Sequence, residues 1–158
     1  MTLATYLITG ANRGIGLEYC RQLKARGDEI IATCRLPSPD LEALGVRIES
    51  GMDVTSRDSL INLKKVLAGT RIDVLIQNAG IAEFNSLLNL DPESITRQFE
   101  VNALSPLLFT EAFLENMEQG SKVALMTSRM GSIEDNTSGA SYGYRISKAA
   151  LCMIGKSL

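Results

Sequence analysis

The chain has 158 residues, of which 45% are hydrophobic and 22% charged, with a formal net charge of -2 and a mean hydropathy of +0.07. This balance is typical of one soluble globular domain, and it argues against a protein that binds nucleic acid or anionic membranes through charge. We find no signal peptide and no membrane-spanning pattern, and therefore expect a cytoplasmic protein.

Cysteine and histidine content limits the chemistry further. The three cysteines, Cys20, Cys34 and Cys152, lack a short ligand-like spacing, so neither a disulfide framework nor a metal site is expected. Histidine is absent, which removes the commonest general base. Any acid–base step must use Tyr, Lys, Asp, Glu or Cys.

Short apolar runs alternate with amphipathic stretches along the chain. The runs predict strands at residues 3–9, 29–34, 46–49, 72–77 and 122–127, and the stretches predict helices at 14–26, 56–67, 92–117 and from 142 onward. Pro106 lies inside the third helical stretch, where we expect a kink or a restart capped by Ser105. Strands that alternate with helices predict a parallel sheet that binds its ligand at the carboxyl ends of the strands.

Three glycines follow the first strand, at positions 10, 14 and 16. They allow a tight turn and a close backbone approach, so that the next helix can direct its free N–H groups at a phosphate. A simple strand-to-helix turn is the alternative, but the position between a strand and an amphipathic helix favours a dinucleotide site. The residues expected to contact the dinucleotide are Gly10, Asn12, Arg13, Gly14, Ile15 and Gly16.

Arg35 follows the second strand, 19 residues after Gly16. An acidic residue here usually holds the ribose hydroxyls of NAD, whereas an arginine accepts the 2'-phosphate of NADP. Arg13 adds a second cation, so we expect NADPH in preference to NADH. The alternative is that Arg35 is a solvated loop residue.

Tyr144 and Lys148 lie four residues apart on a predicted helix and therefore share a face. An ammonium near a phenol favours the phenolate, which suits Tyr144 to proton transfer. The alternative is a surface tyrosine beside a solvated lysine, and only the pairing with the glycine turn makes the pattern specific.

With the glycine turn, the segment 144–151 resembles the short-chain dehydrogenase/reductase family, and most of all its C-factor and sniffer-type carbonyl reductases. The resemblance implies an α/β doubly wound (Rossmann) parallel sheet with strand order 3-2-1-4-5. It also implies that residues 1–158 form a single NAD(P)-binding domain that ends within the helix carrying Tyr144 and Lys148.

The resemblance assigns roles to further residues. Ser128 would polarise the substrate oxygen, with Ser132 as a rival because the gap to Tyr144 is longer than usual in the family. Asn102 would join a water relay to Lys148, and Lys148 would also hold the nicotinamide ribose. The remaining expected cofactor contacts are Asp53, Val54, Asn78, Ala79 and Gly80.

Family members continue past this helix into two more strands, a turn near the nicotinamide and a segment over the substrate. We therefore expect the chain to be C-terminally incomplete relative to the family. The resemblance implies an NADPH-dependent carbonyl reductase acting on a small molecule, as a homodimer or homotetramer through residues 102–117 and 142–158. The alternatives are a non-catalytic NADP-binding signalling or interaction module, and an inactive fragment of a full-length reductase.

Overall fold

The computed structural model describes residues 3–158. The chain forms two compact units, one made of the residues up to Ala79 with Phe109–Ala124, the other of Gly80–Leu108 with Leu125–Leu158. Among the described residues, no helix has both the length and the apolar character needed to cross a bilayer.

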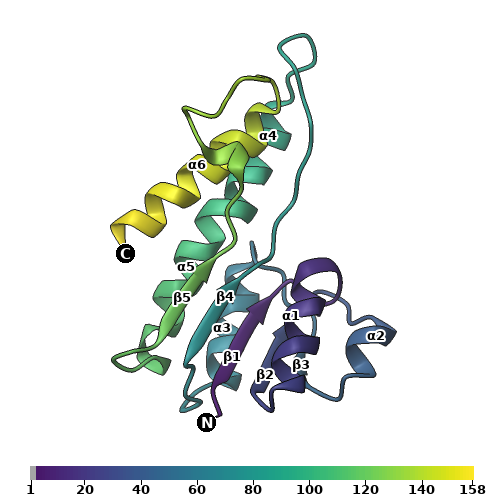
Figure 1. Ribbon diagram of the computed structural model, residues 1–158, viewed down its shortest axis with the longest axis vertical. Coiled ribbons are helices and arrows are strands. Elements are labelled where there is room, and N and C mark those ends of the chain that lie inside the picture. The colour runs from purple at the N-terminus through teal and green to yellow at the C-terminus, as the bar shows by residue number, and fades with distance from the viewer. Residues whose placement is uncertain (1–2) are drawn as a thin grey trace. The chain divides into compact units, whose positions relative to one another are not determined.

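The first unit is built on a five-stranded sheet of order β3-β2-β1-β4-β5, as expected (Figure 1). Its strands are β1 (Thr5–Thr9), β2 (Glu29–Thr33), β3 (Arg47–Glu49), β4 (Val74–Gln77) and β5 (Lys122–Leu125). The β1 strand pairs in parallel with β2 and with β4, and Leu7 lies opposite both Ile31 and Leu75. Each of the five strands is one or two residues shorter than the predicted run.

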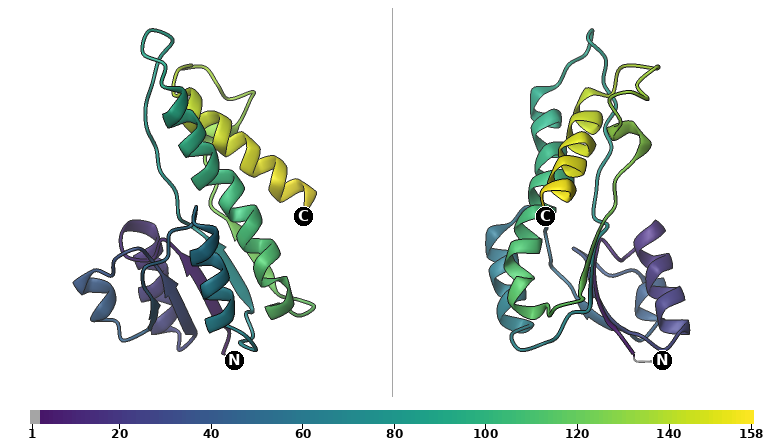
Figure 2. Two further views of the ribbon diagram at one scale, coloured as in Figure 1. Left: turned by 180° about the vertical axis from the view of Figure 1, so that it is seen from behind. Right: turned by 60° about the vertical axis from the view of Figure 1, so that its left-hand side comes forward.

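Helices cover both faces of this sheet (Figure 2). The helices of the first part of the chain are α1 (Gly14–Ala25), the short and unpredicted α2 (Pro39–Glu42), and α3 (Arg57–Val66). A buried cluster joins strand residues such as Leu7 and Leu75 to Leu63 of α3 and to Phe109 and Phe113. This core fixes the strand ends from which the first candidate site is built.

The predicted helix 92–117 is not continuous. It consists of α4 (Pro92–Phe99), a π-type turn η1 (Glu100–Leu104), α5 (Ser105–Phe113) and a 3-10 turn η2 (Leu114–Asn116). Pro106 has no N–H to offer the carbonyl of Asn102 four residues earlier, and the chain passes this point with a wider turn. Ser105 is not an N-cap, because its own backbone is helical, with φ -58° and ψ -47°. Its hydroxyl donates to the carbonyl of Glu100 at 2.8 Å.

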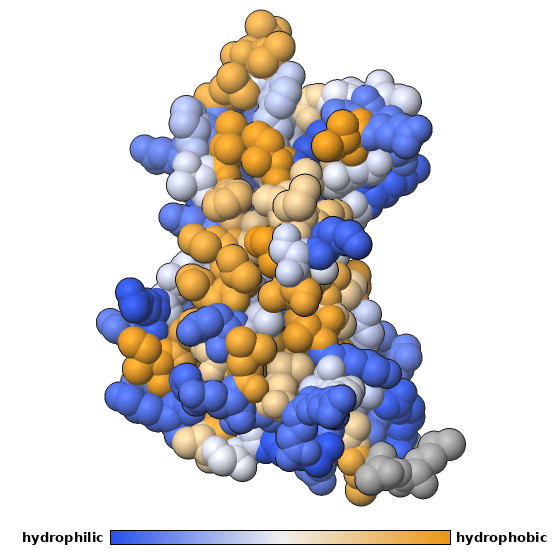
Figure 3. Space-filling model, turned by 90° about the vertical axis from the view of Figure 1, so that its left-hand side faces the viewer, coloured by the Kyte–Doolittle hydropathy of each residue, from blue (hydrophilic) through white to orange (hydrophobic). Residues whose placement is uncertain are grey.

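The second unit contains α4, η1, a short turn η3 (Arg129–Gly131) and α6 (Tyr142–Ser157), and α6 packs against α4 (Figure 2). A long loop, residues 80–91, leads into α4. Its outer part exposes Phe84, Leu87 and Leu88, the last 99% exposed, and apolar side chains gather at the top of Figure 3.

Candidate functional site

The glycine turn is closed by contacts that leave no room for side chains. A Cβ on Gly10 would lie 2.8 Å from the Ala79 Cα, and one on Gly16 would lie 2.5 Å from the Asn78 Nδ2 and would also collide with the Gly10 carbonyl. Gly14 has a φ of +55°, and a Cβ there would meet nothing within 4 Å. The turn is therefore tight on its inner side and open at Gly14.

The amino end of α1 suits an anion. No side chain caps it, its N-cap residue is Arg13, and its first turn contains no acidic residue. Uncapped helical N–H groups with open space in front of them form an anion site. These residues therefore fit the phosphates of a dinucleotide.

Thr9 and Asn78 brace this turn against the neighbouring strand. The Thr9 hydroxyl accepts the backbone N–H groups of Asn78 and Ala79, each at 3.0 Å. The Asn78 side chain donates to the carbonyls of Thr9 at 3.1 Å and Gly10 at 3.0 Å. The side chain of Asn78 thus holds the turn in shape, and Thr9 is a supporting residue that the sequence did not single out.

Arg35 lies just beyond β2, exposed, with its carbonyl accepting the N–H of Gly51 at 2.9 Å. The Asp53 carboxylate accepts the N–H and hydroxyl of Thr55 at 2.9 and 2.8 Å. These bonds, with a smaller contribution from the Arg35 charge, lower the pKa of Asp53. Val54 packs against the core. The first unit thus brings Arg35 and Asp53 within electrostatic reach of each other.

In the second unit, Tyr144 and Lys148 share a face of α6 as expected. The Lys148 ammonium lies 5.7 Å from the centroid of the Tyr144 ring and donates to the carbonyl of Met126 at 2.7 Å. Lys148 is 5% exposed, and this burial lowers its pKa. An ammonium has three donors, so the bond to Met126 leaves two for other partners.

Asn102 is fully buried in η1 and uses its whole amide. Its oxygen accepts the N–H of Ile81 at 2.8 Å, and its Nδ2 donates to the carbonyl of Ile81 at 2.8 Å and to the Ser147 hydroxyl at 3.0 Å. Ser147 in turn donates to the Tyr144 carbonyl at 2.8 Å. Asn102 therefore connects the loop after Gly80 with the helix of Tyr144.

Ser128 and Ser132 both cap turns. The half-buried Ser128 accepts the N–H of Met130 at 3.2 Å, and the exposed Ser132 accepts that of Asp135 at 3.1 Å. Between them, a Cβ on Gly131 would lie 2.8 Å from the carbonyl carbon of Lys148. The missing side chain lets η3 pack directly on the α6 backbone, and Ser128 begins this packed turn.

A family model described as "short chain dehydrogenase" matches residues 4–158. The 1-hydroxy-2-glutathionyl-2-methyl-3-butene dehydrogenase of Rhodococcus sp. (strain AD45) is 43% identical over 155 residues, which cover 97% of this chain and 69% of that protein. The chain belongs to the short-chain dehydrogenase family. C-signal of Myxococcus xanthus is 47% identical over 90 residues, 55% of this chain and 54% of that protein.

Solved structures of carbonyl reductases have the same fold. One from Pseudomonas aeruginosa PAO1, in complex with NADP, has a TM-score of 0.88 at 34% identity and is matched over 98% of this chain and 74% of its own. The carbonyl reductase Sniffer of D. melanogaster has a TM-score of 0.85 at 26% identity, over 99% of this chain and 74% of its own. The chain thus spans about half to three quarters of the length of these relatives.

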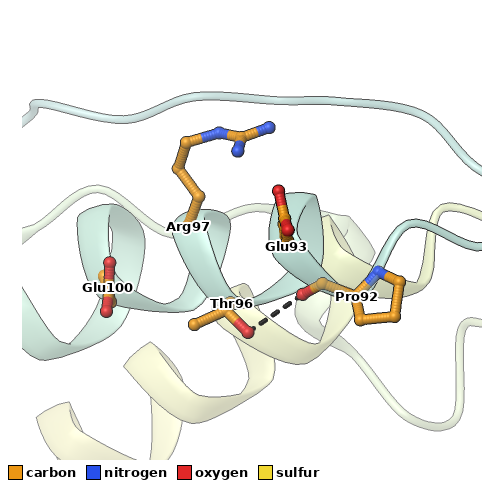
Figure 4. A pocket seen from close by; sticks show the side chains of 5 residues that line it. All are labelled: Pro92, Glu93, Thr96, Arg97 and Glu100. Carbon is orange, nitrogen blue, oxygen red and sulfur yellow. Dashed lines mark hydrogen bonds between the residues drawn. The ribbon is translucent and has the colours of Figure 1, made fainter.

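Several buried polar residues of the second unit were missed from the sequence, among them Asn85, Gln98 and Ser147. Gln98 and Asn102 are four residues apart on one helical stretch, and buried amides at this spacing are the signal that could have identified them. Another face of α4 carries a pocket lined by Pro92, Glu93, Thr96, Arg97 and Glu100 (Figure 4). None of these five is a predicted site residue.

Proposed function

We propose that this protein is an NADPH-dependent oxidoreductase that reduces a carbonyl to an alcohol. The observation that carries the proposal is the occurrence in one chain of an uncapped glycine turn open at Gly14 and a buried lysine 5.7 Å from the Tyr144 ring. The family model and the carbonyl reductases of known structure support the same reaction class.

The residues would divide the work as follows. The amides at the start of α1 would hold the pyrophosphate, Asp53 and Val54 would contact the adenine side, and Arg35 with Arg13 would receive the 2'-phosphate. Asn78, Ala79 and Gly80, after the fourth strand, would complete the cofactor contacts. Bound NADPH supplies a hydride to the carbonyl carbon. Tyr144 donates its hydroxyl proton to the carbonyl oxygen, Ser128 or Ser132 donates a hydrogen bond to that oxygen, and Lys148 and Asn102 support the resupply of the proton.

The test is NADPH oxidation by the chain against a panel of aldehydes and diketones, with fluorescence titration of NADPH in parallel. Oxidation of alcohols with NADP+ belongs in the panel because the Rhodococcus relative is named a dehydrogenase of a hydroxy compound. Tyr144→Phe is expected to lower turnover by about 10²–10⁴-fold with unchanged NADPH affinity. Turnover retained in Tyr144→Phe would refute the role.

Arg35 provides the test of cofactor preference. Loss of a charge-assisted bond to the 2'-phosphate is worth about 1.5–3 kcal/mol, or about 10–100-fold in affinity. Arg35→Ala should therefore weaken NADPH binding while sparing NADH. Tighter binding of NADH than NADPH by the unaltered chain would contradict the preference.

A second candidate is an NADP-binding signalling or interaction module without turnover, motivated by the match to C-signal. NADPH binding with no reaction of any carbonyl or alcohol would favour it.

For either function we propose a homodimer or homotetramer through residues 102–117 and 142–158. Leu104, Leu108, Ile146 and Met153, all in the second unit, expose apolar side chains suited to such an interface. A monomer by light scattering at micromolar concentration would count against it.

A further inference from the structure

Two buried amides hold the segment that follows Gly80. Asn102 binds both the N–H and the carbonyl of Ile81, and Gln98 binds both the N–H and the carbonyl of Glu83, at 3.0 and 3.2 Å. The spacing explains the pairing, because four residues of helix and two of extended chain each advance about 6 Å. The segment is therefore fixed along the helix up to Glu83.

Asn85, which follows in the same segment, binds the start of α6. The backbone carbonyl of Asn85 accepts the N–H of Ser141 at 2.8 Å, and its side-chain oxygen accepts the N–H of Tyr142 at 2.9 Å. Ser141 does not cap the helix with its own hydroxyl. Asn85 thus caps α6 from a different part of the chain, two residues before Tyr144.

The backbone at this start is strained. Ala140 and Ser141 have φ values of +51° and +52°, and they are the two non-glycine residues with positive φ in the described part of the chain. Such conformations persist where the surroundings enforce them. Here Asn85 holds Ser141 from one side, and the Arg145 guanidinium binds the carbonyls of Gly139 and Ala140 at 3.3 and 3.2 Å from the other.

Asn85 also has an unused donor. It is 8% exposed, and its Nδ2 is buried without a hydrogen-bond partner among residues 3–158. A buried donor left unpaired is costly, whereas the oxygen of the same amide accepts the Tyr142 N–H. The arrangement uses Asn85 as an acceptor, at the positive end of a helix.

We propose that Asn85 is a positioning residue, which sets where α6 begins and thereby where Tyr144 presents its hydroxyl. It acts through the backbone of Ser141 and Tyr142 and does not touch the reacting atoms. Gln98 supports it by fixing Glu83, and also by lying against Gly143, where a Cβ would come within 2.5 Å of the Gln98 Nε2. The role in catalysis rests on the proposed function, but the role in placing Tyr144 does not.

The test compares three substitutions that leave the Asn85 backbone bond intact. Asn85→Leu removes the acceptor for Tyr142, and in Asn85→Ser the side-chain oxygen lies one bond nearer the backbone, too close to reach the Tyr142 N–H. Asn85→Asp keeps an acceptor oxygen at the original position in either protonation state, loses the unpaired donor and gains a titratable carboxyl. We expect kcat to fall about 10–100-fold in Asn85→Leu and Asn85→Ser, as for a catalytic group displaced by about 1 Å. Asn85→Asp should retain most of the wild-type kcat, and NADPH affinity should be unchanged in all three.

Asn89→Ala is the matched control from the same loop, because the Asn89 side chain accepts only the local N–H and hydroxyl of Ser86. It should leave kcat unchanged. A loss of kcat in Asn85→Asp equal to that in Asn85→Leu, or full kcat in both Asn85→Leu and Asn85→Ser, would overturn the proposal.

NMR separates this proposal from the proposed function. In wild type and Asn85→Asp the Tyr142 amide should be protected from hydrogen exchange and the Tyr144 ring ¹³C signals should coincide. In Asn85→Ser the protection should be lost and the ring signals displaced. If the wild type shows no turnover but Asn85→Ser shows these NMR changes, the proposed reductase function is wrong and the positioning role of Asn85 stands. If the wild type is active but the signals of Asn85→Ser are unchanged, the positioning role is wrong and the reductase function stands.

Discussion

The glycine turn of the first unit and the polar cluster around Tyr144 in the second are built in opposite ways. The phosphate-facing residues of the turn are close together in sequence, and the close approach of its backbone depends on side chains that are missing, with Asn78 as a brace from the neighbouring strand. The cluster joins residues from Ile81 to Lys148, and its geometry depends on buried amides and hydroxyls that use nearly all their hydrogen-bonding capacity. A short sequence pattern can encode the first kind of site, whereas the second exists only once the helices have packed.

This difference predicts which property each region controls. Changes in the turn should weaken cofactor binding, and changes in the cluster should lower turnover at unchanged cofactor affinity. The predictions below test this separation, from the largest expected effect to the smallest.

Gly16→Ala should break the turn. The new Cβ would collide with the Gly10 carbonyl and the Asn78 Nδ2, and so push apart the backbone that approaches the phosphate. We expect NADPH affinity to fall by more than about 100-fold, since overpacking of this kind costs about 1–3 kcal/mol and the loss of phosphate bonds adds to it. Fluorescence titration measures the affinity.

Gly69→Ala is the control for Gly16→Ala. Gly69 has a positive φ, +73°, and open space at its Cβ, and it follows α3, outside the turn. It should lower the free energy of unfolding by about 1 kcal/mol and leave NADPH affinity intact. Equal loss of affinity in both variants would mean that the turn has no special role.

Asn102→Asp should lower turnover and stability together. The aspartate keeps the acceptor for the Ile81 N–H but loses both donors, so the Ile81 carbonyl and the Ser147 hydroxyl lose their partner. We expect a loss of about 2–4 kcal/mol in the free energy of unfolding and a fall in kcat. Urea denaturation and steady-state kinetics measure the two.

Ser147→Ala tests the same group of hydrogen bonds with a smaller change. It removes one bond from Asn102 and one to the Tyr144 carbonyl, and should cost about 1 kcal/mol. A variant of Asn102 with lowered NADPH affinity and unchanged kcat would contradict the division between the two regions.

Gly131→Ala should push η3 away from α6. Its Cβ would lie 2.8 Å from the carbonyl carbon and 2.9 Å from the carbonyl oxygen of Lys148, and backbone atoms in a helix cannot easily move aside. We expect about 1–3 kcal/mol of destabilisation and a fall in kcat of about tenfold. Gly120→Ala, with open space at its Cβ and a position in the first unit, is the control for kcat, and an equal fall there would show that the packing of η3 is unimportant.

The smallest effect concerns the pH dependence of stability. Burial lowers the pKa of Lys148 below its ordinary value of 10.5. Between the lowered pKa and 10.5 the unfolded chain binds more protons than the folded one, so this residue makes stability rise with pH in that window. Below the lowered pKa its cost of burial is fully present and constant.

Lys148→Met should therefore remove the increase in stability with pH that Lys148 causes. The difference in the free energy of unfolding between wild type and Lys148→Met, measured by urea denaturation without cofactor at several alkaline pH values, should change in favour of wild type as pH increases. A difference that is constant with pH would mean that Lys148 is not desolvated.

Helical spacing predicted the shared face of Tyr144 and Lys148, and apolar periodicity predicted the strands, because both are local signals. The order of the sheet followed from the resemblance to the short-chain dehydrogenase/reductase family. It did not predict the π-type turn at Glu100–Leu104, although Pro106 pointed to an interruption nearby. A proline shows that one helical bond is missing, but how the helix accommodates the loss depends on what packs around it. The roles of Asn85, Gln98 and Ser147 likewise depend on partners 15 to 57 residues away.

The amino-acid sequence by itself determined the strands and the glycine turn, because conformational freedom and hydrophobic periodicity belong to neighbouring residues. Its motifs also determined the family, and with the family the order of the sheet. Only the tertiary structure decided how Asn78 braces that turn, why Gly131 must lack a side chain, and how α6 is held at its start by Asn85. Each of these depends on a contact between segments far apart in the chain, and such a contact forms only when burial makes an unpaired polar group or an empty space costly.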